Sequence, residues 1–155
     1  MTAGLYTKLG ELGLSLPDAP APAANYVPYV ISGNLVFVSG QISVDDEGEM
    51  IVGKLGRDML TADGAHAASR CALALLAQLK AACGGDLSRL KRVVKLTGFV
   101  NSTPEFSEQP AVINGASNLL VDLLGDIGKH SRSAVSAASL PFGVAVEIEG
   151  IFEIV

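Results

Sequence analysis

Val144–Val155 reads VAVEIEGIFEIV, a stretch in which apolar and acidic side chains alternate with a period of two. Its acidic residues occupy odd positions, at Glu147, Glu149 and Glu153, and its even positions are apolar at Val144, Val146, Ile148, Phe152 and Ile154. This period is typical of a β-strand that turns one face to the core and the other to a polar surrounding. We therefore expect the chain to end in a half-buried strand of a sheet.

Five segments upstream also predict strands, because they are short, rich in β-branched or aromatic residues and bounded by turn residues. They are Tyr29–Ile31, Leu35–Val38, Met50–Val52, Leu90–Val100 and Ser133–Ala137. Ser32-Gly33-Asn34 predicts a hairpin turn between the first two. The alternation within the fourth segment predicts one shared face for Val94, Leu96, Gly98 and Val100.

Two long amphipathic helices are predicted between these strands. The first starts with Thr61 as N-cap and Asp63 in its first turn, and runs to about Cys83, with an apolar stripe of Ala68, Cys71, Ala72, Leu75, Leu76 and Leu79. Arg70 and Gln78 fall outside that stripe. The second is predicted over Pro104–Leu124 with Thr103 as N-cap, and its stripe is Phe106, Ile113, Ala116, Leu119, Leu120 and Leu123.

The predicted order of elements is β-β-β-α-β-α-β-β. One sheet with only two long helices indicates an α+β fold in which both helices are layered on one face. Residues 1–22 are set apart, because 4–14 predict a short helix and Pro17–Pro22 (PDAPAP) predict a stiff connector. The chain of 155 residues is of the size of a single domain.

Composition restricts the partners that the chain could have. Hydrophobic residues make up 49% and charged residues 17% of the chain, and this apolar surplus predicts surface buried between subunits. A net charge of -5 without a Lys/Arg run disfavours nucleic acid. No apolar run is long enough for a membrane span, and residues 1–8 lack the pattern of a secretory signal, so we expect a cytoplasmic protein without a membrane partner.

The common cofactor and nucleophile motifs are absent from the sequence. Gly53–Arg57 contains Gly-Lys but no following Ser or Thr, and we interpret it as an ordinary loop. His66 and His130 have no cysteine or carboxylate at ligand spacing, so no metal site is predicted. Cys71 and Cys83 are twelve residues apart on one predicted helix, too distant for a disulfide.

Four short motifs follow one another along the chain: Ser39–Ile42 (SGQI), Ser131–Val135 (SRSAV), Leu140-Pro141 and Val146–Glu149 (VEIE). Together with the element order they resemble the YjgF/RidA family, over roughly residues 25–155. We therefore divide the chain into residues 1–22 and a YjgF/RidA-like domain at residues 23–155.

The resemblance implies a chorismate-mutase-like fold, a mixed sheet with the two long helices on one face. It also implies a homotrimer with a central β-barrel and three clefts between subunits. The activity implied is hydrolysis of reactive 2-imino acids, such as 2-iminobutanoate and 2-iminopropanoate, to 2-keto acids and ammonia. No cofactor is implied, and the only partners are further copies of the chain and a small imino or keto acid.

Carried over by position, the family's carboxylate-binding arginine falls on Arg132 and its water-positioning glutamate on Glu147. The remaining cleft residues are Tyr26, Ser39, Asn114 and the backbone N–H of Ala134. Ala134 stands where the family often has cysteine, which argues against a cysteine-dependent mechanism. Further departures, at Asn25–Val27, at Ser131, in the N-terminal helix and in the loops around Gly53 and Glu108, indicate a side branch whose substrate can differ.

The chemistry of these residue types suits an imino acid. A guanidinium binds a planar carboxylate with two parallel hydrogen bonds, and a nearby carboxylate on a neighbouring strand can deprotonate a water that adds to the imine carbon. A second hypothesis is a binding module that holds a small carboxylate metabolite without turnover, and a third is ribonuclease activity. By residue pattern alone, Arg132 and Glu147 also fit solvated positions at a strand start and on a polar face.

Overall fold

The computed structural model describes residues 4–19 and 24–155. Short 3-10 turns lie at Leu87–Arg89, Gly125–Gly128 and Pro141–Gly143. The helices and strands are α1 (Leu5–Glu11), β1 (Tyr29–Ser32), β2 (Leu35–Ile42), α2 (Thr61–Ala82), β3 (Leu90–Asn101), α3 (Gln109–Leu124), β4 (Ser131–Ala137) and β5 (Val146–Ile154). The short N-terminal helix is confirmed, whereas residues 20–22 of the predicted Pro-rich connector lie outside the described residues.

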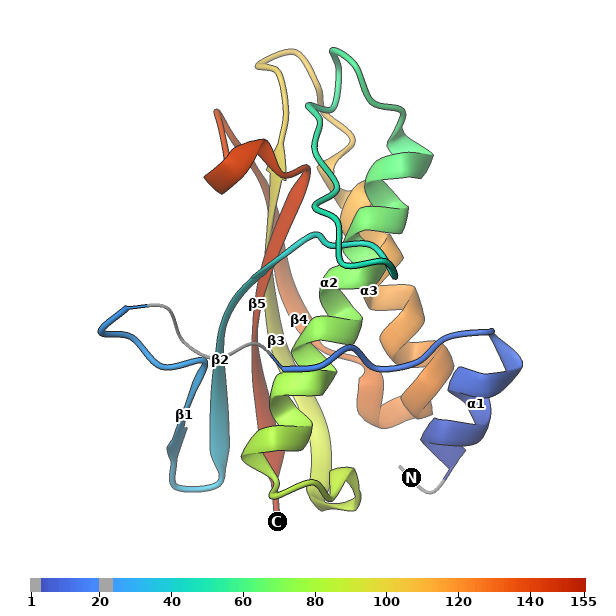
Figure 1. Cartoon of the computed structure of the whole chain (residues 1–155), viewed down its shortest axis with the longest axis vertical. Coiled ribbons are helices and arrows are strands. Elements are labelled where there is room, and N and C mark those ends of the chain that lie inside the picture. The colour runs from blue at the N-terminus through green and yellow to red at the C-terminus, as the bar shows by residue number, and fades with distance from the viewer. Residues whose placement is uncertain (1–3, 20–23) are drawn as a thin grey trace.

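The strands form one sheet in the order β1-β2-β5-β3-β4. Only the β3–β4 pair is parallel, so the sheet is mixed. Figure 1 shows α2 and α3 side by side on one face of this sheet, with α1 beside the lower end of α3. The predicted α+β fold with both long helices on one face is therefore confirmed.

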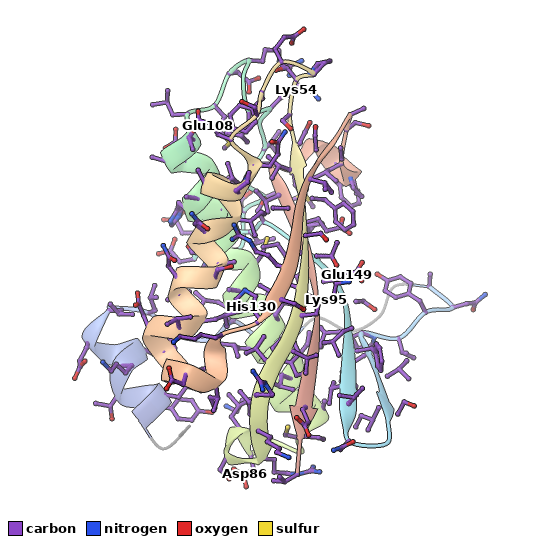
Figure 2. The ribbon with its side chains drawn as sticks, turned by 180° about the vertical axis from the view of Figure 1, so that it is seen from behind. Lys54, Asp86, Lys95, Glu108, His130 and Glu149 are labelled. Carbon is purple, nitrogen blue, oxygen red and sulfur yellow. The ribbon has the colours of Figure 1, made fainter. Side chains whose placement is uncertain are left out.

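The central strand β5 has the alternation that the sequence predicted. Val146, Ile148, Phe152 and Ile154 are buried, between 0% and 3% exposed, and pack into the core below the helices. Glu147, Glu149 and Glu153 alternate with them on the opposite face of the sheet, hereafter the outer face. Figure 2 shows Glu149 and Lys95 on the outer face, away from the two helices.

The helices α2 and α3 pack very closely where Gly115 meets Ala65. A Cβ atom on Gly115 would overlap the backbone carbonyl of Ala65, so this crossing requires glycine. The start of α2 differs from the prediction by one residue. Leu60, rather than Thr61, is the N-cap, because its backbone is extended and its carbonyl accepts hydrogen bonds from the N–H groups of Asp63 and Gly64.

The start of α3 is also corrected. The helix begins at Gln109 with Glu108 as N-cap, five residues after the predicted Pro104. Pro110 explains the difference, because proline is accommodated in the first turn of a helix but breaks its interior. Phe106 therefore belongs to the preceding loop, from which it packs against the core.

Two strand predictions are corrected as well. The register of β3 against β5 shifts between Val93 and Lys95, so Val93 is fully buried while Val94 is partly exposed. Leu96, Gly98 and Val100 share the buried face as predicted. Met50–Val52 is not a strand, because its residues form only isolated bridges, between Met50 and Val44 and between Val52 and Val144.

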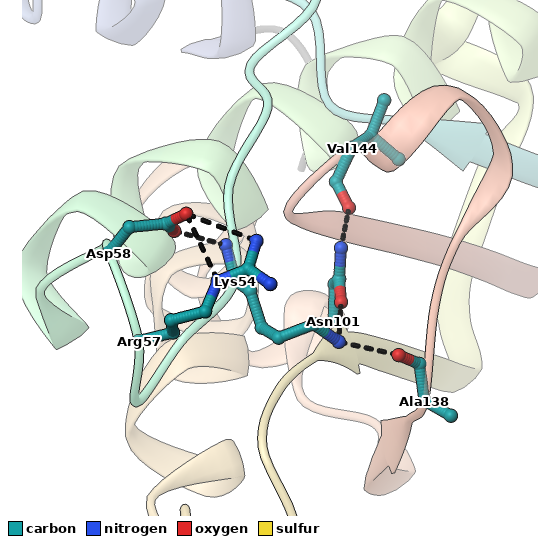
Figure 3. Close-up of polar contacts among 6 residues, drawn as sticks. All are labelled: Lys54, Arg57, Asp58, Asn101, Ala138 and Val144. Carbon is teal, nitrogen blue, oxygen red and sulfur yellow. Dashed lines mark hydrogen bonds and ion pairs between the residues drawn. The ribbon is translucent and has the colours of Figure 1, made fainter.

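The loop at Gly53–Arg57 ties three parts of the chain together (Figure 3). The Lys54 ammonium donates to the Asn101 side chain at 2.7 Å and to the carbonyl of Ala138, and the Lys54 backbone N–H donates to Asp58 Oδ1. Asn101 in turn donates to the Val144 carbonyl at 3.1 Å. The segment thus forms a loop whose Lys54 ammonium is already engaged by other parts of the chain.

Cys71 and Cys83 are both buried free cysteines, so the expectation of no disulfide between them is confirmed. Burial raises the pKa of the Cys71 thiol far above its ordinary value, which removes it as a nucleophile. In residues 4–19 and 24–155, no helix combines the length and the apolar character needed to cross a bilayer.

Candidate functional site

A pocket of about 1020 Å³ lies at the end of β2 that β1 does not cover, and we call it the edge pocket. Ser39–Ile42 of β2 forms one wall, and α2 forms another with Arg70, Ala74 and Gln78. The turn at Asp45–Gly48 and the segment Ser15–Asp18 also line it. The pocket thus gathers the N-terminal segment, the free end of β2 and one side of α2.

Glu147 enters this pocket across a bulge in β2. The register between β2 and β5 shifts between Val38 and Gln41, and a Cβ atom on Gly40 would collide with the Glu147 carboxylate. The close approach therefore requires glycine at position 40. Burial raises the pKa of Glu147 above its ordinary value, and the negative charge of Glu149 raises it further.

Tyr26 and Ser39 lie in the same pocket as Glu147. The Ser39 hydroxyl donates to the carbonyl of Val27 at 2.8 Å, and its backbone N–H donates to the carbonyl of Pro28 at 2.9 Å. These two bonds hold the segment that carries Tyr26, whose side chain is 58% exposed at the pocket surface. The structure thus brings together Tyr26, Ser39 and Glu147 of the predicted site.

Arg132 lies in a separate cluster, which we define as Arg132, Ser117 and His130 and call the arginine cluster. Arg132 Nη1 donates to the Ser117 hydroxyl oxygen at 3.0 Å, and Nη2 donates to the Pro110 carbonyl at 3.3 Å. His130 Nε2 lies 2.9 Å from the same hydroxyl, and its Nδ1 lies 2.6 Å from the carbonyl of Gly128. Figure 2 shows His130 between α3 and the sheet.

The directions of these bonds follow from the donors and acceptors available. A carbonyl only accepts, so His130 Nδ1 carries a proton and donates it to Gly128. In the neutral ring Nε2 is then an acceptor, which receives the hydroxyl proton of Ser117. The Ser117 oxygen remains free to accept from Arg132, so the guanidinium is held by a continuous chain of hydrogen bonds.

Within one chain, Glu147 and Arg132 lie on opposite faces of the sheet. Arg132 is aligned with Leu96 in the parallel pair and shares its helix-covered face, whereas Glu147 is aligned with Phe99 on the outer face. Strand β3 also separates β4 from β5. The expectation that Glu147 lies on a strand neighbouring that of Arg132 is therefore wrong.

Asn114 and Ala134 lie on the side of Arg132. Asn114 is exposed on α3, one turn from Pro110 and one turn from Ser117, the two residues that Arg132 contacts. Ala134 follows Arg132 on the same face of β4 and is aligned with Gly98. Within one chain the predicted site residues thus fall into two groups, which we call the two predicted half-sites: Tyr26, Ser39 and Glu147 in the first, and Arg132, Asn114 and Ala134 in the second.

The sequence analysis missed two residues of the edge pocket. Arg70 and Gln78 are only 9% and 2% exposed, although both fell outside the predicted apolar stripe of α2. Their spacing from Ala74, four residues on either side, places all three along one side of the helix. This four-residue spacing is the sequence signal that could have placed Arg70 and Gln78 together on one buried side of α2.

A five-stranded mixed sheet covered by two helices, with a pocket at its edge, is the architecture of a chorismate-mutase-like protein. The family model described as "YjgF/chorismate_mutase-like, putative endoribonuclease" matches residues 6–149. The chain belongs to this family, YjgF/RidA, as its motifs indicated.

Similar proteins include divergent members of the family. Protein TCP17 of Trypanosoma cruzi is 50% identical over 147 residues, which cover 94% of this chain and 91% of the relative. The crystal structure of Atu1372 from Agrobacterium tumefaciens, a protein of unknown function, has 51% identity and a TM-score of 0.93, and the match covers 99% and 94% of the two chains. A protein of Dermatophagoides farinae named 2-iminobutanoate/2-iminopropanoate deaminase is 30% identical over 139 residues, 89% of this chain and 92% of the relative.

Proposed function

We propose that this protein is a cofactor-free hydrolase that converts 2-imino acids of the 2-iminobutanoate/2-iminopropanoate type to 2-keto acids and ammonia. Membership of the YjgF/RidA family and the likeness to a protein named as such a deaminase support this proposal. The observation that carries it is Glu147, a partly buried carboxylate with a raised pKa that lies over Gly40 in the edge pocket.

In the proposed reaction, Glu147 accepts a proton from water while the water oxygen adds to C2 of the protonated imine. The product is a carbinolamine, and the proton on Glu147 then passes to its nitrogen. The C–N bond breaks, ammonia leaves, and the hydroxyl proton is released as the C2 carbonyl forms. A raised pKa suits both steps, because the carboxyl has to take a proton and return it near neutral pH.

Arg132 is the proposed anchor for the carboxylate of the substrate. Its guanidinium is held by Ser117 and Pro110, so it is oriented before the substrate arrives. Because Arg132 and Glu147 lie on opposite faces of one sheet, the proposed active site takes each residue from a different subunit. The substrate then binds in a cleft between subunits.

A homotrimer with a central β-barrel is the assembly that we propose for this purpose. The outer face of the sheet carries apolar side chains that are 41% to 52% exposed in the single chain, at Phe37, Val135 and Val30. Covering this face by other subunits would remove these side chains from water. The same assembly would bring the two half-sites of adjoining subunits together.

The test is release of ammonia and keto acid from 2-iminobutanoate that a threonine dehydratase generates in situ. We expect a rate above the solvent background for the wild type, loss of that rate in Arg132→Ala, and slower turnover with retained binding in Glu147→Gln. Arg57→Ala, which changes an exposed arginine of the loop before α2, is the matched control and should keep the full rate.

Light scattering and thermal melting show whether each variant keeps the assembly and the fold of the wild type. A wild-type rate in Arg132→Ala would contradict the assigned site. Saturable keto-acid binding without any acceleration of imine hydrolysis would instead indicate a metabolite-binding protein, which is the alternative function.

A further inference from the structure

Within the part of the chain that the structure describes, Arg70 is a buried cation without an ion pair. Its side chain is 9% exposed, and its Nε donates to the carbonyl of Val44 at 3.1 Å. The ion pairs of residues 4–19 and 24–155 are Arg57–Asp58, Lys91–Glu153 and Lys129–Asp126, so no described carboxylate lies within ion-pair distance of Arg70. Buried arginines are normally paired, because an unpaired charge loses hydration without compensation.

The free part of the Arg70 guanidinium is accessible from the edge pocket. Among the described residues, no buried side-chain nitrogen or oxygen atom lacks a hydrogen-bond partner. Arg70 lines the edge pocket, and its one hydrogen bond uses Nε. Its two terminal nitrogens form no hydrogen bond within the described residues and are not fully buried, so they are available to a carboxylate in the pocket, which a guanidinium can bind with two parallel hydrogen bonds.

The charges around the pocket restrict what can bind to Arg70. The mouth is acidic, with Asp18, Asp46 and Glu47 exposed to solvent. One carboxylate oxygen of Asp45, Oδ1, is already engaged, because it accepts hydrogen bonds from the backbone N–H groups of Glu47 and Glu49. This rim disfavours polyanions, whereas a small molecule that has a carboxylate and a positively charged nitrogen matches both the inner arginine and the acidic surroundings.

A protonated 2-imino acid has that combination of charges, and Arg70 lines the same pocket as Glu147. In the proposed reaction Arg132 of an adjoining subunit holds the carboxylate next to the imine, so Arg70 remains available for a second one. We propose that Arg70 binds a carboxylate in the side chain of the substrate, and that the preferred substrates are imino derivatives of acidic amino acids. This inference rests on the proposed function and names its substrate class.

The test compares two ligands of matched shape by titration calorimetry. The probe is 2-oxoglutarate, and the matched ligand is 2-oxo-5-methylhexanoate, in which two methyl groups replace the oxygens of the distal carboxylate. We expect the wild type to bind 2-oxoglutarate at least about tenfold more tightly, the factor typical of a hydrogen bond to a charged group. Equal affinities of the wild type for the two ligands would overturn the proposal.

Substitutions of Arg70 test whether this residue causes the preference for 2-oxoglutarate. Arg70→Gln should abolish it by weakening only 2-oxoglutarate, and Arg70→Lys should retain part of it because the charge is kept without the planar fork. Arg57→Gln, at an exposed arginine outside the edge pocket, should behave as the wild type. If thermal melting shows that Arg70→Gln does not fold, the comparison between the wild type and Arg70→Lys decides, and an unchanged preference in Arg70→Lys would contradict the proposal.

Turnover separates this inference from the proposed function. Ammonia release is measured with 2-iminoglutarate, made in situ by an amino-acid oxidase, and with 2-iminobutanoate. A binding preference for 2-oxoglutarate without hydrolysis of either imine would support Arg70 as the residue that binds the second carboxylate and would contradict the proposed function. Hydrolysis of 2-iminobutanoate without a preference for the dicarboxylate would leave the function standing and overturn the inference.

Discussion

Glu147 is a partly buried carboxylate on the outer face of β5. Its neighbours Val146 and Ile148 are fully buried, and its own carboxylate lies over Gly40, where any side chain would collide with it. The resulting burial raises the pKa of the carboxyl group. A carboxyl with a raised pKa in the folded state costs stability once it is ionised, so function and stability are in conflict at this residue.

The pH dependence of stability follows from that raised pKa. Folding favours the protonated form of Glu147, so its contribution to stability is complete at low pH and is lost as the pH rises through the folded-state pKa. We expect Glu147→Gln to raise the melting temperature at pH 7 and to have little effect below the ordinary pKa of glutamate. Thermal unfolding at both pH values checks this, with Glu105→Gln in an exposed loop as the control. A lower melting temperature for Glu147→Gln at pH 7 would contradict the expectation.

Ser117 connects Arg132 to His130 and therefore positions the guanidinium. We expect Ser117→Ala to raise the KM of the proposed reaction about tenfold while kcat changes less, since a hydrogen bond to a charged group contributes about 1.5–3 kcal/mol. Ser117→Thr keeps the hydroxyl and should restore most of the binding. Asn118→Ala, at the next and exposed position of α3, serves as the control.

A nitrogen NMR measurement of the His130 ring tests the same cluster without reference to activity. The wild type should show a proton on Nδ1, bonded to the Gly128 carbonyl, and an acceptor at Nε2. A proton on Nε2 alone would show that the assigned direction of the hydrogen-bond chain is wrong.

At the scale of elements, the crossing of α2 and α3 depends on Gly115. No side chain fits there, because the backbone of Ala65 occupies the space that a Cβ atom would need. The stripes of the two helices then close over the even positions of β5. The packing of the apolar core therefore depends on the close contact between the α2 and α3 backbones at Gly115 as well as on the pattern of apolar side chains.

Gly115→Ala should force the two helices apart and lower the free energy of unfolding by about 1–3 kcal/mol, as overpacking of a core does. Gly10→Ala in α1 is the matched control, because a Cβ atom there meets nothing within 4 Å. That control should gain about 0.5–1 kcal/mol, since alanine favours a helix more than glycine does. Urea unfolding of both variants measures the difference, and equal stabilities would contradict the role of Gly115.

At the scale of the whole molecule, the proposed active site requires more than one chain. The edge pocket lies at the free end of β2, and the arginine cluster lies between β4 and α3, with strands β5 and β3 between β2 and β4. The exposed apolar side chains of the outer face are available for association. We therefore expect the proposed reaction to take place between subunits of the assembly and not within a single chain.

Mixing two inactive variants tests this placement. Subunits with Arg132→Ala keep Glu147, and subunits with Glu147→Gln keep Arg132. If the variants are unfolded and refolded together in equal amounts, about a quarter of the clefts between randomly mixed subunits should combine both native residues. Ammonia release should then return in the mixture and stay absent when each variant is refolded alone. A mixture without activity, despite mixed assemblies in native mass spectrometry, would contradict a shared site.

Local patterns predicted much of the fold. The alternation in Val144–Val155 identified β5, and Ser32-Gly33-Asn34 identified the hairpin between β1 and β2. The apolar stripe of α2 was also predicted, because period and turn chemistry are properties of short segments. The start of α3 was missed although Pro110 marks it, since Thr103-Pro104 provides a similar signal five residues earlier.

The sequence by itself determined most of the elements, the family and the residue types that the proposed chemistry needs. Only the tertiary structure decided that Arg132 and Glu147 lie on opposite faces, that Gly40 makes room for Glu147, and that Arg70 lines the same pocket. The physical reason is that a side chain's face and neighbours depend on strand order, register and bulges. These arise from pairing between distant segments, which no local pattern encodes.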